Sequence, residues 1–211
     1  MADQAIEGTK MKLYYNRHAY PLDLERCPCD LHFVQYLESR RLEGKTIFHF
    51  GTGDHHLVGR DNHERGNPNE ILAITASYQP DTGRSGEHES YIDFIVNNPA
   101  AANYYKVLFA DVYTLSPRTL PNFDVVTLFH LCEFYNEEKS RYARLDDRKL
   151  LEMLLSKLNA GGKVLFYTKS AGYVEKGREA AALVDDFISQ GKLSIEDEYE
   201  ALLICRRGGS Y

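Results

Sequence analysis

The chain has 211 residues, of which 43% are hydrophobic and 27% are charged, and its formal net charge is −6. These values are typical of one globular domain with a single core, and the negative charge disfavours a broad electrostatic interaction with nucleic acid. The apolar runs are too short to cross a bilayer. The N-terminal segment has acids where a signal peptide has basic residues, so we expect a cytoplasmic protein without membrane contact.

The first 29 residues are less regular than the rest, and we interpret them as an N-terminal arm before one domain over 30–211. In this arm, Cys27 and Cys29 form a C-x-C motif. A lone C-x-C lacks the second pair of ligands that a structural zinc site needs, so we expect no metal there. Cys132 and Cys205 lie in apolar runs and are expected in the core.

Helices and strands alternate in the rest of the chain. The sequence DLHFVQYLESRRLEG predicts a helix over 30–44 that Asp30 caps and Gly44 ends. Continuous apolar runs predict buried strands, and a 3.6-residue apolar period predicts helices. The strands are expected at 46–50, 71–75, 106–110, 123–129 and 163–168, and the helices at 87–98, 145–158 and 175–190. This order predicts a parallel sheet with helices on both faces.

The C-terminal segment departs from this alternation. Two strand-like runs, at 192–197 and 199–206, have almost nothing between them. A parallel pair needs a crossover of a dozen or more residues, whereas an antiparallel pair can turn within two. We therefore expect the last strand to run against its neighbour.

The stretch FHFGTGDHHLVG, residues 48–59, follows the first predicted strand. Gly51 and Gly53 would allow the backbone to approach a ligand closely. A nicotinamide dehydrogenase would need glycine where His56 stands and an acid about 20 residues further on. This stretch and the four residues after it also supply groups that suit divalent metals, at positions 49, 54, 55, 56, 61 and 63. Their spacing matches no known metal motif, so we expect them to pack in a strand, a loop and a short helix, with no metal bound.

From about residue 30 to residue 206, the chain resembles the class I S-adenosylmethionine-dependent methyltransferase family. The similarity rests on HFGTG after the first strand, FADVY at the third, NFDVVTLFHLCEF at the fourth, and LLSKLNAGGKVLFYT before the reversed last strand. It implies a three-layer Rossmann-like α/β sandwich with a seven-stranded, mostly parallel sheet. The antiparallel last strand, 199–206, would lie beside 163–168, with 192–197 at the edge. The implied cofactor is S-adenosylmethionine, bound beyond the carboxyl ends of the strands.

The resemblance also implies which residues bind this cofactor. Asp111 matches an acid near the adenine amino group, and Phe129, His130 and Leu131 would face the sulfonium and the methyl acceptor. The full implied set is His49, Gly51, Thr52, Gly53, Thr75, Ser77, Asp111, Val112 and Phe129.

Three positions differ from the family pattern. His49 stands where the family has an acid, so we expect His49→Glu to tighten cofactor binding. Thr75 and Ser77 replace an acid that holds the ribose hydroxyls. His55 replaces the third loop glycine, so that His55 or His56 would face the pocket. Charged hydrogen bonds contribute about 1.5–3 kcal/mol each, so the missing acids matter for binding.

The function that we expect is methyl transfer from S-adenosylmethionine to a small molecule or saccharide. His130, with Glu133 in the same segment, is the candidate general base, because an imidazole titrates close to neutral pH. The alternative is a protein of this fold without activity that serves as a binding or structural subunit. The expected partner is a small-molecule substrate, and a homodimer is left open.

Overall fold

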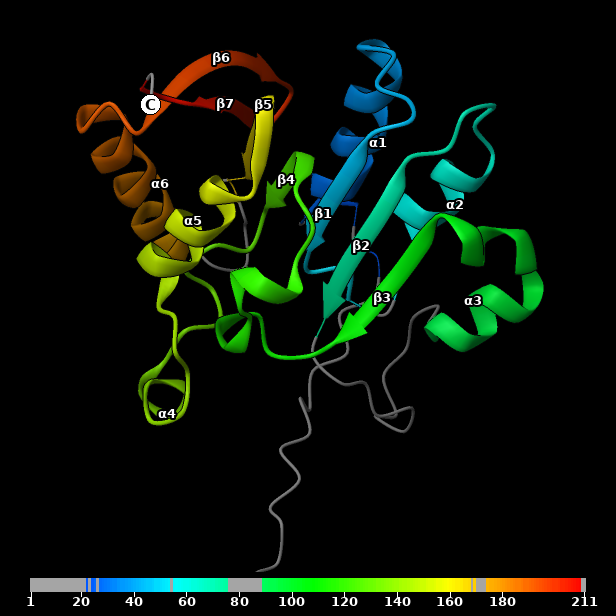
Figure 1. Cartoon of the computed structure of the whole chain (residues 1–211), viewed down its shortest axis with the longest axis horizontal. Coiled ribbons are helices and arrows are strands. Elements are labelled where there is room, and N and C mark those ends of the chain that lie inside the picture. Colours follow the sequence, from blue (N-terminus) through cyan, green and yellow to red (C-terminus); the bar gives the residue numbers. More distant parts are fainter. Residues whose placement is uncertain are drawn as a thin grey trace, which may run out of the picture.

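Figure 1 shows a computed structural model of the protein, which describes residues 22, 24, 25, 27–53, 55–75, 89–167, 169 and 174–209. Most of the expected N-terminal arm lies outside these residues, as do Asp54 and Ser77, so the boundary at residue 29 stays a prediction. No helix in the described ranges is long and apolar enough to span a membrane.

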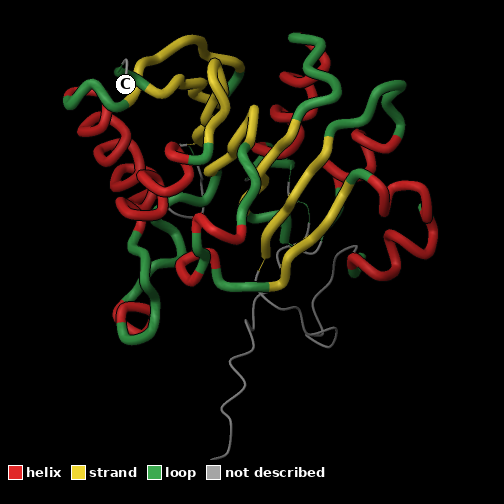
Figure 2. Tube along the Cα trace, in the orientation of Figure 1, coloured by secondary structure: helices red, strands yellow, loops and turns green. Residues whose placement is uncertain are grey.

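A seven-stranded sheet forms the centre of the molecule (Figure 2). Its strands are β1 (Thr46–Phe50), β2 (Glu70–Thr75), β3 (Tyr105–Phe109), β4 (Phe123–Leu128), β5 (Leu158–Tyr167), β6 (Leu193–Tyr199) and β7 (Leu202–Arg207). They follow the order β3-β2-β1-β4-β5-β7-β6. The predicted fold class is confirmed, and the largest shift in a strand boundary is at β5, which begins at Leu158 instead of residue 163.

The end of the sheet has the predicted topology. β7 pairs antiparallel with β5, where Leu165 lies opposite Ile204, and antiparallel with the edge strand β6. The other described pairs are parallel. Glu200, with φ of 53°, lies in the tight connection between β6 and β7. The short connection in the sequence therefore gave the correct strand direction.

Helices cover both faces of the sheet and complete three layers (Figure 1). The helices are α1 (Cys29–Ser39), α2 (Leu57–His63), α3 (Tyr91–Asn97), α4 (Glu137–Ser140), α5 (Asp147–Ser156) and α6 (Val174–Ser189). α1 to α3 pack on one face through residues such as Phe33 and Phe94, and α5 and α6 pack on the other through residues such as Leu151 and Phe187. Because helices cover both faces, the inner strands β1 and β4 are buried along almost their whole length.

The first helix begins and ends at other residues than predicted. α1 runs from Cys29 to Ser39, and Pro28 holds its N-cap position, so Asp30 lies inside the first turn instead of capping the helix. The Asp30 side chain is buried. The N-terminus of α1 lies at the edge of the sheet where β1 ends (Figure 1), which brings this carboxylate to the glycine loop.

Candidate active site

The glycine loop follows β1 at the carboxyl edge of the sheet. β1 lies between β2 and β4, where the strand order reverses, which is the usual ligand position in sheets of this kind. Gly51 and Gly53 have φ of 93° and 59°, a region that favours glycine. The Gly51 N–H donates to the carbonyl of Ile74 at 3.1 Å. Backbone conformation therefore favours glycine at both positions.

His130 lies directly against this loop. A Cβ on Gly51 would come within 2.3 Å of His130 Cδ2, so the glycine makes room for the imidazole. His130 Nδ1 lies 2.9 Å from Glu133 Oε2. Burial disfavours the charged imidazole, but the hydrogen bond and the charge of Glu133 raise the pKa of His130 to about 9. At neutral pH the ring is protonated, and in this state it cannot act as the predicted general base.

His49 points away from the loop into the interior. Its ring stacks on Phe33, with 6.0 Å between ring centroids, and its Nδ1 lies 2.8 Å from Thr127 Oγ1. Its Nε2 lies 3.6 Å from Asp30 Oδ1, and the other Asp30 oxygen lies 3.7 Å from His55 Nδ1. α1 thus brings a carboxylate to the position where the loop sequence has none.

Asp30 is the residue of this site that the sequence analysis assigned to a different role. Burial alone would raise the pKa of its carboxyl, but His49 and His55, with a smaller effect of His130, lower it to about 2. The carboxylate is therefore ionised at neutral pH, although its side chain is only 3% exposed. Its negative charge faces imidazoles from β1 and from the loop.

Aromatic rings close the other side of the loop. Thr52 Oγ1 and His56 Nδ1 each lie 3.0 Å from Tyr105 Oη, and Thr52 donates to the carbonyl of His55. His56 also packs on Phe94. Burial, with a smaller effect of the His55 charge, lowers the pKa of His56 to about 4, so this ring is neutral. His56 packs in the core instead of facing a pocket.

The histidine-rich stretch does not form a common metal site within the described ranges. His49 and His55 contact Asp30, whereas His56 contacts Tyr105. Asp61 forms an ion pair with Arg65 on the surface side of α2. For positions 49, 55, 56, 61 and 63, the expectation that they lie in a strand, a loop and a short helix agrees with the structure.

Asp111 lies just beyond the end of β3, as predicted, and it has partners in the protein. It accepts hydrogen bonds from the Tyr113 N–H at 3.1 Å and from Tyr142 Oη at 2.6 Å. Lys139 Nζ lies 3.0 Å from its carboxylate. It also caps the short 3-10 helix over Val112–Thr114. The carboxylate is thus available at the predicted edge but is already held by a cap and a cation.

The remaining predicted residues fall into two groups. Thr75 ends β2 at the carboxyl edge, and Ser77 lies outside the described residues. Val112 and Phe129 have buried side chains in the core. The Phe129 and Leu131 side chains pack in the cores on opposite faces of the sheet, and their approach to the sulfonium stays a prediction.

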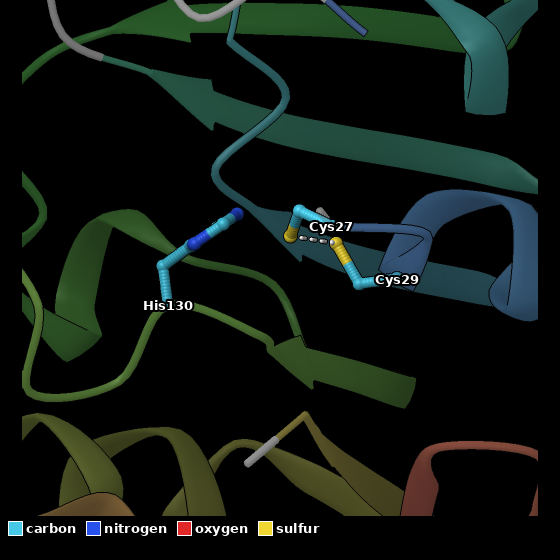
Figure 3. Close-up of side chains that lie close together, drawn as sticks. All are labelled: Cys27, Cys29 and His130. Atoms are coloured by element: carbon cyan, nitrogen blue, oxygen red, sulfur yellow. Dashed lines mark hydrogen bonds between the residues drawn. The ribbon is translucent and has the colours of Figure 1, made fainter. Parts of the chain in front are cut away.

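Cys27 and Cys29 lie beside His130, which the sequence analysis did not anticipate (Figure 3). Their sulfurs are 3.3 Å apart. The hydrogen bond between them lowers the pKa of Cys27 to about 7 and, together with burial, raises the pKa of Cys29 well above its ordinary value. Of the two thiols, Cys27 therefore loses its proton more readily.

Comparisons with known proteins identify the fold. No family model matches the sequence, and no curated protein matches it. Among solved structures, the chain is similar to a putative O-methyltransferase from Klebsiella pneumoniae, with 10% identity over 91% of this chain and 84% of that one, and a TM-score of 0.53. A putative rRNA-methylase from Clostridium thermocellum has 12% identity over 89% and 100% of the two chains, with a TM-score of 0.52.

A third structure is the N-terminal domain of EvdMO1, solved in the presence of SAH and D-fucose. It has 13% identity over 94% of this chain and 92% of that one, with a TM-score of 0.50. At such identities the likeness concerns the fold. The protein has the class I methyltransferase fold, with the seven-stranded sheet and reversed last strand that the sequence resemblance implied.

Proposed function

We propose that the protein binds S-adenosylmethionine at the carboxyl edge of the sheet and transfers its methyl group to a small molecule or saccharide. One observation carries this proposal. A two-glycine loop in left-handed backbone conformations follows β1 at the reversal of strand order. Such a loop lets backbone N–H groups approach a ligand where a Cβ would otherwise stand in the way.

The described residues fit this cofactor in their chemistry. The backbone of Gly51, Thr52 and Gly53 would hold its amino-acid part, and Asp30 supplies a carboxylate beside the same loop. Thr75 offers a hydroxyl to the ribose, and Asp111 offers an acceptor to the adenine. When bound, the cofactor supplies an electrophilic methyl group on a sulfonium.

Positioning, rather than proton abstraction by His130, is the proposed source of rate acceleration. The pKa of His130 is raised to about 9, so its ring already holds a second proton at neutral pH. Alignment of two bound reactants can by itself contribute about 7–11 kcal/mol to lowering a barrier. The chain would therefore act by holding the acceptor nucleophile in line with the methyl group.

A saccharide is the acceptor class that we favour. The EvdMO1 domain, which shares this fold, was crystallised in the presence of SAH and D-fucose. The net charge of −6 disfavours a polyanionic acceptor such as nucleic acid. The ionised Asp30 also lies at the carboxyl edge of the sheet, where its carboxylate would repel phosphates and could accept hydrogen bonds from hydroxyls.

Calorimetric titration with S-adenosylmethionine and S-adenosylhomocysteine tests the proposal. Both ligands should bind the wild type, and Asp111→Asn should weaken each by about 1–3 kcal/mol, because a charged acceptor is lost. Asparagine is still a good N-cap, so this variant keeps the local helix and separates binding from folding. Asp186→Asn is the matched control. It removes an exposed carboxylate of α6 that pairs with Arg148 of α5, and this variant should bind both ligands normally.

A second candidate function is binding or structural support without catalysis. Two observations favour it: the His130 ring occupies the space in front of Gly51, and residue 49 offers no carboxylate. Under this alternative, neither ligand binds the wild type, and Asp111→Asn has no effect. Absence of heat for both ligands, with the protein folded by circular dichroism, would decide against the methyltransferase proposal.

A further inference from the structure

Three ligand-type side chains from two distant parts of the chain meet at the carboxyl edge of the sheet. Cys27 and Cys29 stand at the start of α1, and His130 follows β4. One atom from each residue lies within 4.8 Å of the atoms of the other two (Figure 3), and the two sulfurs are 3.3 Å apart. Within the described ranges, this set has three members.

The spacing is close to what a tetrahedral ion requires. Zinc binds thiolate sulfur at about 2.3 Å and imidazole nitrogen at about 2.0–2.1 Å, which places neighbouring ligand atoms roughly 3.5–3.8 Å apart. The sulfurs are already slightly closer than this, at 3.3 Å, and the imidazole needs to move by roughly 1 Å at most. A small rotation of side chains would complete the geometry.

The histidine is held as a metal ligand usually is. Its Nδ1 is bonded to Glu133 Oε2 at 2.9 Å, which leaves Nε2 directed toward the two cysteines (Figure 3). A metal-bound histidine almost always bonds a carboxylate or carbonyl through its other ring nitrogen, which fixes the ring and its tautomer. Gly51 contributes by leaving room for the ring, since any Cβ there would meet Cδ2.

The local charge also favours a cation. Asp30 Oδ1 lies 3.7 Å from Cys29 Sγ, and Glu133 lies behind the histidine with a side chain that is 5% exposed. Two thiolates beside these carboxylates would repel one another in a buried site unless a cation joined them. Two sulfur ligands and one imidazole select a soft or borderline ion such as Zn²⁺ over Mg²⁺ or Ca²⁺.

We propose that Cys27, Cys29 and His130 bind one Zn²⁺ ion, with Glu133 as the positioning residue. Three protein ligands are the number that catalytic zinc sites use, with a further position for water or substrate. Binding requires both thiols to lose their protons to solvent and Nε2 of the imidazole to be unprotonated. This proposal is independent of whether the protein binds S-adenosylmethionine.

Titration of the full-length, metal-free protein with Zn²⁺ and with Co²⁺, in a reductant that contains no thiol, tests the site. One equivalent of Zn²⁺ should bind and raise the melting temperature. Co²⁺ should give a thiolate-to-metal charge-transfer band in the near ultraviolet, together with the visible bands of a tetrahedral ion. Calorimetry in buffers of different ionisation enthalpy should detect the released protons.

Variants of the chain assign the ligands. Cys27→Ser, Cys29→Ser and His130→Ala should each weaken Zn²⁺ binding by more than a hundredfold, and the two cysteine variants should weaken the charge-transfer band. Glu133→Gln should retain the tetrahedral spectrum but weaken binding by about 10–100-fold, as loss of an outer-shell partner does. Cys205→Ser is the matched control, because it removes a buried cysteine from β7, and it should bind normally.

Any of four outcomes would overturn the proposal, and the first three concern metal binding. They are the absence of stoichiometric Zn²⁺ binding by the reduced, folded wild type; a Co²⁺ spectrum without thiolate bands; and unchanged affinity in Cys27→Ser or Cys29→Ser. A mass decrease that shows a Cys27–Cys29 disulfide under the same reducing conditions would also overturn it, because the sulfurs would then serve a redox role. Circular dichroism of each metal-free variant keeps a folding defect from being counted as lost binding.

Discussion

The two sides of the glycine loop hold histidines in opposite states. The aromatic side consists of Thr52, His56, Phe94 and Tyr105. The polar side consists of Cys27, Cys29, Asp30, His49, His55, His130 and Glu133. The pKa of His56 is lowered to about 4 on the first side, and that of His130 is raised to about 9 on the second. The same side chain is therefore neutral on one side and charged on the other.

Hydrogen-bond partners explain this difference. A hydroxyl has one proton, and that of Thr52 goes to the carbonyl of His55, so Tyr105 must donate to Thr52 and His56 must donate to Tyr105. This series of hydrogen bonds gives Nδ1 of a neutral imidazole an acceptor and offers the ring no charge. His130 has a carboxylate partner instead. Burial thus produces a structural histidine beside hydroxyls and a charged one beside Glu133.

The largest effect is expected from His49→Glu, which places a second carboxylate beside Asp30. The sequence alone led us to expect tighter cofactor binding from this variant. Because His49 Nε2 lies 3.6 Å from Asp30 in a buried position, we now expect it to destabilise the fold by about 3–5 kcal/mol at pH 7. Urea unfolding measures this change.

Two control variants identify the cause of that loss. His49→Gln should be milder, because it removes the imidazole without adding a charge. Asp30→Asn combined with His49→Glu should recover part of the stability, since one carboxylate is then absent. If His49→Glu were as stable as the wild type, Asp30 would not be a buried, ionised carboxylate.

The next effect in size concerns the aromatic side and depends on pH. The pKa of His56 is about 4 in the folded protein and about 6.5 in an unfolded chain, so between these values the unfolded state binds more protons. The stability due to the neutral ring is complete above about pH 6.5 and is lost as pH falls toward 4, by about 3 kcal/mol. Urea unfolding of the wild type and of His56→Phe at several pH values measures the difference. Parallel curves for the two proteins would contradict the assignment of a neutral His56.

Gly51→Ala tests how closely His130 approaches the loop. The new Cβ meets both an unfavourable φ of 93° and the imidazole at 2.3 Å. Gly161, with φ of 75° and open space at its Cβ, is the matched control. We expect losses of about 2–3 kcal/mol for Gly51→Ala and about 1–2 kcal/mol for Gly161→Ala. In the Gly51→Ala background, His130→Ala should reduce the loss toward the value for Gly161→Ala. Equal losses for the two glycine variants, with no coupling to His130→Ala, would mean that His130 does not contact the loop.

The fold could be predicted from the sequence because its signals are local. Continuous apolar runs gave the strands, and the short connection before β7 gave its direction. The polar side could not be assembled in this way, because its residues come from α1, β1, the loop and the segment after β4. The sequence did contain one signal for the position of Cys29 and Asp30. A helix that packs antiparallel on the following strand begins where that strand ends, which places these two residues near the glycine loop.

The sequence also did not show the position of single residues in their elements or the groups that their side chains contact. Asp30 has the residue type and place of an N-cap, but the N-cap position is two residues earlier, at Pro28, and the Asp30 carboxylate lies inward beside His49. Phe129 and Leu131 follow β4 without a break in apolar character, and nothing in the sequence shows that they enter opposite cores while His130 faces the loop. These are properties of packing, which depends on neighbours far along the chain.

The smallest effect is expected from Tyr105→Phe, which removes only the hydroxyl at the centre of the aromatic side. His56 Nδ1 then has no acceptor there, and Thr52 Oγ1 loses its donor, so we expect a loss of about 1–2 kcal/mol in unfolding free energy. Tyr91→Phe is the matched control: it deletes one hydrogen bond, from Tyr91 Oη to the Tyr105 carbonyl, and should cost about 0.5–1 kcal/mol. In a double-mutant cycle, Tyr105→Phe should couple to Thr52→Val, because the two changes remove the same hydrogen bond. Tyr91→Phe and Thr52→Val should have additive effects. Additivity of all three substitutions would mean that no hydroxyl chain joins the loop to β3, and the neutral state of His56 would then rest on burial alone.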